Sequence, residues 1–331
     1  NASMFNSQTA WIVANRVLKN IVYVGGLGDC VQNGDDPPGS NNQIEWNRVV
    51  TAMSPIESPA QTGLPEGIPF GLSVGNHDQT PIGNPSGTST YFNQFFGFSH
   101  FNGRSYYGGR YGTANNDNHY QLFTASGIDF LVISFEYDQT GGFSAAGGPL
   151  DWAEGLVQTY SNRKVIVMTH WGINEDQSFS TQGTAIYNRL RAYPNFMFFT
   201  CGHVHSTDWE ARRSDTYNGN TVHTMLSDYQ DRAGGGNGLL RILEFDPQLD
   251  RLSVKTYSPF LSTYETDADS EFDLPIKLGA YTLIGEVNNA VSGTSNCVNW
   301  PGLLETTQYE WYAEVSDGEN TTTGPLWTFT T

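Results

Sequence analysis

Hydrophobic and polar positions follow two alternating periods in the N-terminal part of the chain. Short apolar runs predict buried strands at 21–24, 70–74, 165–168 and 196–200. Apolar positions at helical spacing predict helices at 7–20, 41–54, 151–160 and 184–192, the first with Ser7 as its N-cap. Strands that alternate with helices in this way are typical of a layered α/β fold.

Strand patterns dominate the rest of the chain. A hairpin is expected at 120–124 and 130–135, and further strands at 221–226, 239–245 and 252–257. The aromatic and glycine-rich stretch 83–118 is expected to be irregular and packed over the core. The pattern changes near 276–279, after which short strands are expected at 281–287, 297–300, 309–315 and 327–330. We therefore expect one domain over 1–275 and a β-rich segment over 276–331.

Polar side chains with metal-binding chemistry directly follow four of the predicted strands. They form the blocks Gly28-Asp29, Gly75-Asn76-His77-Asp78, Thr169-His170 and Gly202-His203-Val204-His205. Strand ends hold side chains on a rigid scaffold, so we expect these blocks to meet. Imidazoles, a carboxylate and an amide oxygen together predict a divalent metal site. The remaining histidines, His100, His119 and His223, are expected to be structural.

Charge and composition narrow the possible partners. The chain has 34 Asp and Glu against 16 Lys and Arg, a net charge of −18, which argues against nucleic acid as the main partner. Abundant Gly, Asn, Thr, Ser and Tyr favour a secreted or periplasmic bacterial protein. We expect no membrane span, and we see no signal peptide. Cys30 and Cys201 are expected to be free thiols, with a bridge between them as the alternative.

In their order and spacing, the four blocks resemble those of calcineurin-like metallophosphoesterases, over residues 7–273. Flanking segments resemble the secreted bacterial branch of that family: 107–109, 227–230 and 256–259. The resemblance implies an α-β-β-α sandwich that binds two divalent ions, of Mn, Zn, Mg or Fe(II). It also implies hydrolysis of small phosphate mono- or diesters by a hydroxide that bridges the two ions.

The resemblance assigns a role to each metal ligand. Asp29 would bridge the two ions. Asn76, His170 and His203 would complete one metal site, and His205 would serve the other.

Further roles follow from the same resemblance. His77 would assist the leaving group, and Asp78 would hold the His77 imidazole in its useful tautomer. Gln32 stands where the related purple acid phosphatases have a tyrosine, so a purple Fe(III) centre is not expected.

One family motif has no counterpart in the chain. It is an Asp-x-His or Asp-x-Gln at the end of an opening strand, and the sequence begins at Asn1, after the place where that strand is expected. Its absence would leave the metal site of His205 short of ligands and would expose sheet edges, with association as one consequence. The alternative hypothesis is therefore a binding or adhesive protein that keeps the fold without catalysis.

Two further segments of the chain have recognisable sequence patterns. Segment 276–331 resembles the C-terminal half of a fibronectin type III module, including the closing residues 327–330. Gly71-Leu72-Ser73-Val74-Gly75 matches the nucleophile elbow of serine hydrolases. An elbow needs a helix directly after it, whereas 76–81 predicts a loop, so Ser73 is expected to lie inside a strand.

Overall fold

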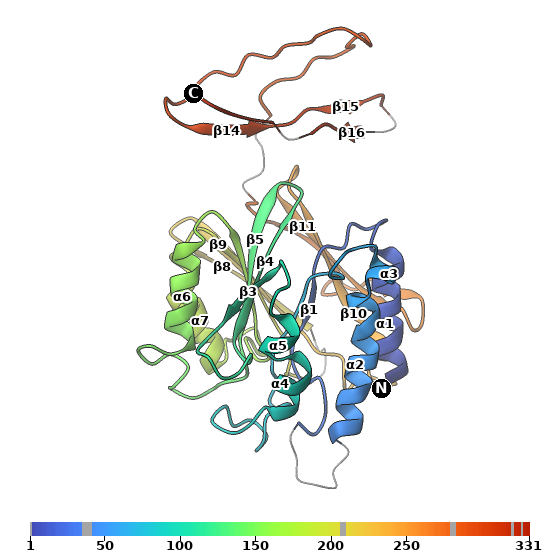
Figure 1. Ribbon diagram of the computed structural model, residues 1–331, viewed down its shortest axis with the longest axis vertical. Coiled ribbons are helices and arrows are strands. Elements are labelled where there is room, and N and C mark those ends of the chain that lie inside the picture. The colour runs from blue at the N-terminus through green and yellow to red at the C-terminus, as the bar shows by residue number, and fades with distance from the viewer. Residues whose placement is uncertain (1, 35–41, 206–209, 279–282, 319–320, 326) are drawn as a thin grey trace. The chain divides into compact units, whose positions relative to one another are not determined.

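The computed structural model describes residues 2–34, 42–205, 210–278, 283–318, 321–325 and 327–331 (Figure 1). The chain divides into two compact units, Asn1–Leu278 and Gly279–Thr331. The first contains all four strand-end blocks.

A seven-stranded sheet forms the centre of the first unit. Its strand order is β3-β4-β5-β6-β7-β9-β8, and β5, β6, β7 and β9 are parallel to one another. The strands are β3 Tyr107–Arg110, β4 His119–Ala125, β5 Ile128–Ser134, β6 Lys164–Met168, β7 Phe196–Cys201, β8 Glu210–Tyr217 and β9 Asn220–Ser227. Helices α6 (Pro149–Thr159) and α7 (Thr181–Leu190) cover one face, where Leu150, Ile186 and Leu190 join the buried core of β5, β6 and β7.

A second β-layer packs on the other face of this sheet. It contains β10 Leu240–Asp246, β11 Arg251–Ser258, β12 Thr263–Glu265 and β13 Glu271–Pro275, together with the parallel pair β1 Val24–Gly26 and β2 Phe70–Leu72. Phe130 and Phe198 of the first sheet pack with Leu252 and Val254 of the second in one buried cluster.

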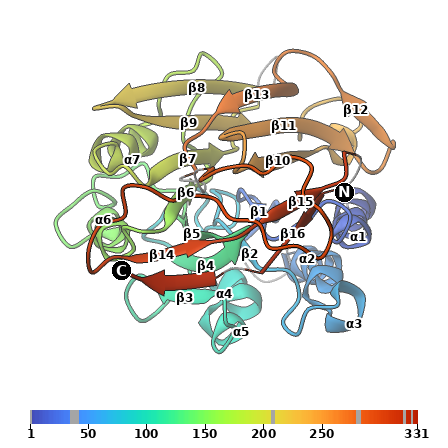
Figure 2. The same ribbon diagram turned by 90° about the horizontal axis from the view of Figure 1, so that it is seen from above.

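Helices also cover the outside of the second layer, as Figure 2 shows. They are α1 Ala2–Asn15, α2 Asn42–Glu57, α3 Pro59–Thr62, α4 Thr90–Phe96 and α5 Phe98–Phe101. Trp46 of α2 and Phe92 and Phe96 of α4 pack with Phe70 of β2 in a second buried cluster. The order helix, sheet, sheet, helix confirms the predicted α-β-β-α sandwich.

Several predicted elements differ in the structure. The first helix starts at Ala2 and ends at Asn15, so Ser7 lies inside it and donates its hydroxyl to the carbonyl of Met4 at 2.7 Å. The stretch 83–118 is not irregular throughout, because it contains α4, α5 and β3. The elbow helix is absent from the described residues after Gly75. Ser73 lies directly after β2 instead of inside a strand, and its backbone N–H donates to the carbonyl of Gly26 at 2.9 Å. Its buried hydroxyl has no hydrogen-bond partner among the described residues.

The second unit consists of two short antiparallel pairs. Strand β14 (Gln308–Trp311) pairs with β17 (Trp327–Thr330), and β15 (Glu314–Ser316) pairs with β16 (Thr321–Thr323). Residues 283–287 and 297–300 are not strands, in contrast to our expectation, while 281 and 282 lie outside the described residues. Most described side chains here are exposed, so these segments lack the buried partners that hold a strand in place.

Two other expectations can be compared with the structure. Cys30, Cys201 and Cys297 are free thiols. No helix within the described residues is long and apolar enough to cross a membrane.

Candidate metal centre

Four loops bring the candidate ligands to one place. Asp29 follows β1 and Asn76 follows β2, while His170 follows β6 and His203 follows β7. Each of these two strand pairs is parallel, so the side chains leave from the carboxyl ends of their strands. The loops of the two layers are joined directly, because Nδ1 of His170 lies 2.7 Å from the carbonyl oxygen of Leu27.

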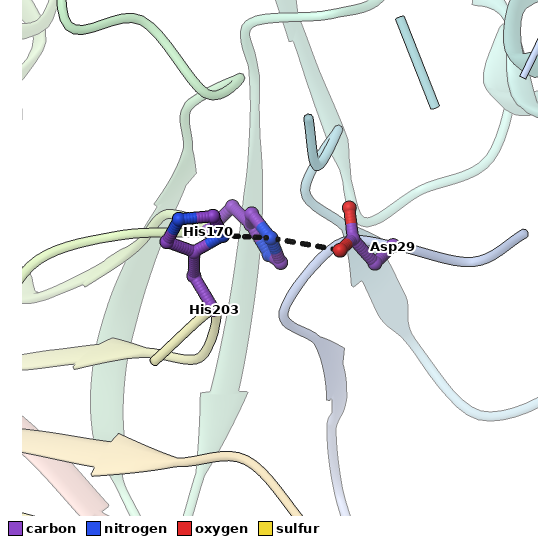
Figure 3. Close-up of side chains that lie close together, drawn as sticks. All are labelled: Asp29, His170 and His203. Atoms are coloured by element: carbon purple, nitrogen blue, oxygen red, sulfur yellow. Dashed lines mark hydrogen bonds and ion pairs between the residues drawn. The ribbon is translucent and has the colours of Figure 1, made fainter. Parts of the chain in front are cut away.

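Three donor atoms converge on Nε2 of His170. Oδ1 of Asn76 lies 3.0 Å away, and Oδ2 of Asp29 and Nδ1 of His203 each lie 3.1 Å away. Figure 3 shows Asp29 and His203 on opposite sides of the His170 ring. The donor atoms of Asp29, His170 and His203 all lie within 4.8 Å of one another.

This spacing fits ligands of a shared cation. The Leu27 carbonyl accepts the Nδ1 proton of a neutral His170, which leaves a lone pair on Nε2. The Asn76 and Asp29 oxygens are acceptors too. A neutral His170 has no Nε2 proton to donate to them, and a protonated His170 has a single Nε2–H for three neighbouring atoms. Two ligands about 2.1 Å from one ion, at a right angle to each other, lie about 3 Å apart. The donor set therefore fits a divalent metal ion of the Mn, Zn or Fe(II) kind.

The charges within the cluster interact strongly. Burial raises the pKa of Asp29, but the contact with His170 outweighs burial and lowers it overall. Burial lowers the pKa of His170, and the contact with Asp29 outweighs burial and raises it overall. Burial and the neighbouring His170 lower the pKa of His203 to about 4. His203 is therefore neutral at physiological pH, which is the form that binds metal.

The backbone at the site adopts unusual conformations where the candidate ligands approach one another. Asp29 and His203 have positive φ values of 51° and 73°, which non-glycine residues rarely adopt. Two glycines allow the close approach: a Cβ on Gly28 would lie 2.6 Å from Nδ1 of His170, and one on Gly75 would lie 2.1 Å from Oδ1 of Asp29. The glycines of the Gly-Asp and Gly-Asn blocks are thus required by packing.

Asp78 does not orient His77, and this expectation was wrong. Its fully buried carboxylate accepts backbone hydrogen bonds from Gly75 at 2.8 Å, Val31 at 3.2 Å and Cys30 at 3.3 Å. Burial raises the pKa of Asp78 to about 7, with Asp29 as the next contribution. Asp78 therefore links the loop after β1 to the loop after β2 through hydrogen bonds to the backbone of both loops.

Gln32 is the residue that contacts the His77 ring. The carbonyl oxygen and the side-chain amide of Gln32 both lie 3.0 Å from Nδ1 of His77. A His77 ring with a proton on Nδ1 donates it to the Gln32 carbonyl, and its Nε2 then faces away from this contact. The backbone N–H of His77 donates to Oδ1 of Asp29 at 2.9 Å, so the main chain of His77 is held beside this candidate ligand. From the sequence, Gln32 was notable only because it replaces the tyrosine of the purple acid phosphatases, so its contact with His77 was not expected.

His205 stands apart from the converging donors. Its side chain is half exposed, and its Nδ1 pairs with Asp231 at 2.6 Å. A cavity of about 320 Å³ lies beside Asp29, His170 and His203. Asp228 also lines this cavity, and burial raises its pKa.

The other histidines have structural partners. Nδ1 of His119 lies 2.7 Å from the carbonyl of Asn116, and burial lowers the pKa of His119 to about 4. Nε2 of His223 lies 2.7 Å from the carbonyl of Pro275, and His100 pairs with Glu57.

Comparison with known proteins identifies the family. A family model described as calcineurin-like phosphoesterase matches residues 11–207, which include all four blocks. The chain belongs to the calcineurin-like phosphoesterase family. This membership and the converging donors agree with the chemistry implied by the motif order.

Individual relatives give less information about function than the family model does. The chain is 30% identical, over 356 aligned residues, to the uncharacterized protein YvnB of Bacillus subtilis (strain 168); the match covers 99% of this chain and 26% of that protein. The chain thus spans about a quarter of this relative's length. It also resembles a dimetal phosphatase from Danio rerio, with a TM-score of 0.44 and 12% identity over 82% of this chain and 89% of the other.

Proposed function

We propose that the chain is a metal-dependent phosphoesterase that hydrolyses small phosphate mono- or diesters. The main support is the approach of Asn76, Asp29 and His203 to Nε2 of His170 at 3.0–3.1 Å, in a chain that belongs to this family. The cavity of about 320 Å³ beside Asp29, His170 and His203 can admit a small ester.

The residues have separate roles in this proposal. Asp29, Asn76, His170 and His203 hold the metal. When bound, divalent ions acidify a water molecule and neutralise charge on the phosphoryl oxygens. In its doubly protonated, imidazolium form, His77 keeps its Nδ1–H on the Gln32 carbonyl and donates its Nε2 proton to the leaving oxygen, which leaves the ring neutral.

Metal content is the first test. The purified chain would be incubated with Mn²⁺ or Zn²⁺, freed of unbound ions and submitted to elemental analysis. We expect at least one ion per chain, and its loss in Asp29→Asn and His170→Ala. His100→Gln is the matched control, because His100 pairs with Glu57 outside the donor cluster. A metal-free native chain would contradict the proposal.

Activity is the second test. Hydrolysis of 4-nitrophenyl phosphate and bis(4-nitrophenyl) phosphate would separate monoester from diester preference. We expect turnover that depends on added metal and is lost in Asp29→Asn. A chain that binds metal but hydrolyses neither ester would favour the alternative, a binding or adhesive protein on the same fold.

The second metal position, the secreted location and the fibronectin-like segment stay predictions. The stoichiometry experiment addresses the first of them. One ion per chain would match the four converging donors, whereas two would require further ligands around His205.

A further inference from the structure

Two aromatic rings stand against the metal ligands. Tyr137 follows β5 and Trp171 follows His170, and their rings lie nearly parallel, with an interplanar angle of 11° and centroids 6.1 Å apart. The His203 ring lies 4.7 Å from Trp171 and 5.3 Å from Tyr137. Tyr137 also reaches His170, at 6.1 Å. We call Tyr137 and Trp171 the aromatic wall.

Polar contacts outside the ring faces fix the wall. The indole Nε1 of Trp171 donates to Oδ1 of Asn174 at 2.9 Å, and the backbone N–H of Asn174 donates to the carbonyl of Ser178 at 2.8 Å. The backbone N–H of Tyr137 donates to the carbonyl of Val74 at 2.8 Å, and Gln79 donates to the Tyr137 carbonyl at 2.9 Å. The Trp171 indole and the main chain of Tyr137 are therefore held in position before any ligand binds.

The wall still presents surface to solvent. Both residues are only partly buried, unlike the aromatic side chains of the core. Packing alone does not require two fixed, partly exposed rings beside a cluster of polar ligands.

We propose that Tyr137 and Trp171 bind the planar aromatic group, aryl or nucleoside, of the phosphate ester and so determine the substrate class. This inference rests on the proposed function. In this proposal a phosphoryl group at an ion held by His170 and His203 has its organic substituent near Tyr137, whose ring lies beside both ligands, and near Trp171, whose ring lies beside His203. Stacking of a base on an aromatic side chain contributes about 1–3 kcal/mol, which is roughly 5- to 150-fold in affinity.

Calorimetry with two phosphonates tests the wall apart from catalysis. Phenylphosphonate and methylphosphonate share the charged group and differ in the ring. With the Mn²⁺-loaded full chain, we expect phenylphosphonate to bind about tenfold more tightly. Trp171→Leu should remove this preference and leave the Kd of methylphosphonate and the metal content unchanged. Tyr137→Leu is a second variant, in case the first does not fold.

The matched control removes an aromatic ring elsewhere. Tyr217 lies beneath the guanidinium of Arg191 at 4.4 Å, at the end of β8, and Tyr217→Leu should keep the phenyl preference. Equal binding of the two phosphonates by the native chain would overturn the inference and leave the phosphoesterase proposal intact. A preference that survives in both wall variants would overturn it as well.

Uncharged ligands separate the remaining outcomes. Adenosine and benzyl alcohol would be titrated while tryptophan fluorescence is followed in the native chain and in Trp171→Leu. Trp171-dependent quenching without any phosphonate binding would support the wall and contradict the proposed function. Stronger quenching by adenosine than by benzyl alcohol would identify a nucleoside ester as the substrate class. If none of the four ligands binds, both proposals fail.

Discussion

At the scale of single residues, the arrangement around His77 separates proton transfer from metal binding. His77 contacts Asp29 only through its backbone N–H, and its ring contacts Gln32. We therefore expect His77→Ala to lower kcat by roughly 10²- to 10⁴-fold, the usual contribution of a general acid. Metal content should stay at the native value because the backbone hydrogen bond remains.

The measurement for His77 is steady-state hydrolysis of two esters with different leaving groups. The variant should lose less with 4-nitrophenyl phosphate than with phenyl phosphate, because nitrophenolate leaves readily without a proton. An equal loss with both esters would contradict the assigned role. His100→Gln again serves as the control.

Glu136 provides a pH-dependent prediction at the same scale. Burial, followed by the charge of Asp117, raises the pKa of Glu136 to about 8. The folded state therefore retains a proton that the unfolded state releases near pH 4.5. Stability from this group is complete below pH 4.5 and is lost as the pH rises toward 8. We expect the free energy of unfolding to fall over this window, with an upper limit of about 5 kcal/mol at about 1.4 kcal/mol per pH unit.

Urea denaturation between pH 5 and pH 9 measures this effect. Glu136→Gln has no proton to lose, so its free energy of unfolding should fall less over the window than that of the native chain. Asp129→Asn, on the partly exposed Arg163 pair, is the control and should follow the native curve. Identical slopes for the native chain and Glu136→Gln would show that the carboxyl is ionised in the folded state.

At the scale of elements, the loops after β1 and β2 depend on one carboxylate. Asp78 accepts three backbone hydrogen bonds in the interior, and an asparagine would place an N–H₂ group against at least one of these donors. A buried donor without a partner costs about 1–3 kcal/mol. We expect Asp78→Asn to lower the free energy of unfolding by that amount and to weaken metal affinity.

Chemical denaturation and metal titration would check this prediction together. Asp246→Asn is the control, since Asp246, at the end of β10, accepts two backbone hydrogen bonds, from Gln248 and Leu249, at a partly exposed site where it also pairs with Arg251. Its effect should be within about 0.5 kcal/mol. A comparable loss in both variants would mean that the burial of Asp78 does not increase its contribution to the free energy of unfolding.

The strands before the four blocks were predictable because their apolar runs are short and end in polar motifs. The contact between His77 and Gln32 could not be predicted from the sequence, because it depends on how the loops after β1 and β2 lie relative to each other. Helix α4 was missed although Phe92 and Phe96 have helical spacing, since their partner Trp46 lies far away in the sequence. Strand β8 was missed because a run such as Glu210-Ala211-Arg212-Arg213 has no apolar period.

Sequence periodicity also placed strands in the second unit that the structure lacks. Apolar residues such as Leu283, Val287 and Val298 are exposed there, with exposed fractions of 77%, 42% and 46%. Alternation predicts a strand only where one face becomes buried.

At the scale of the whole molecule, the end of the first unit belongs to the buried core of that unit. We expected the first domain to end at 275, whereas the compact unit extends to Leu278. Ile276 and Leu278 are 3% and 1% exposed and belong to the cluster between the two sheets. Their backbone N–H groups bond to the carbonyl and the carboxylate of Asp250.

Two truncated chains test this boundary. A chain that ends at 278 keeps this buried cluster, so it should retain the metal content and the free energy of unfolding of the main transition. A chain that ends at 275 loses two buried side chains, each worth about 1.5–3 kcal/mol, and should unfold at a clearly lower urea concentration. Equal stability of the two would place the boundary at 275. If the chain ending at 278 aggregates or loses its metal, the first unit depends on the second.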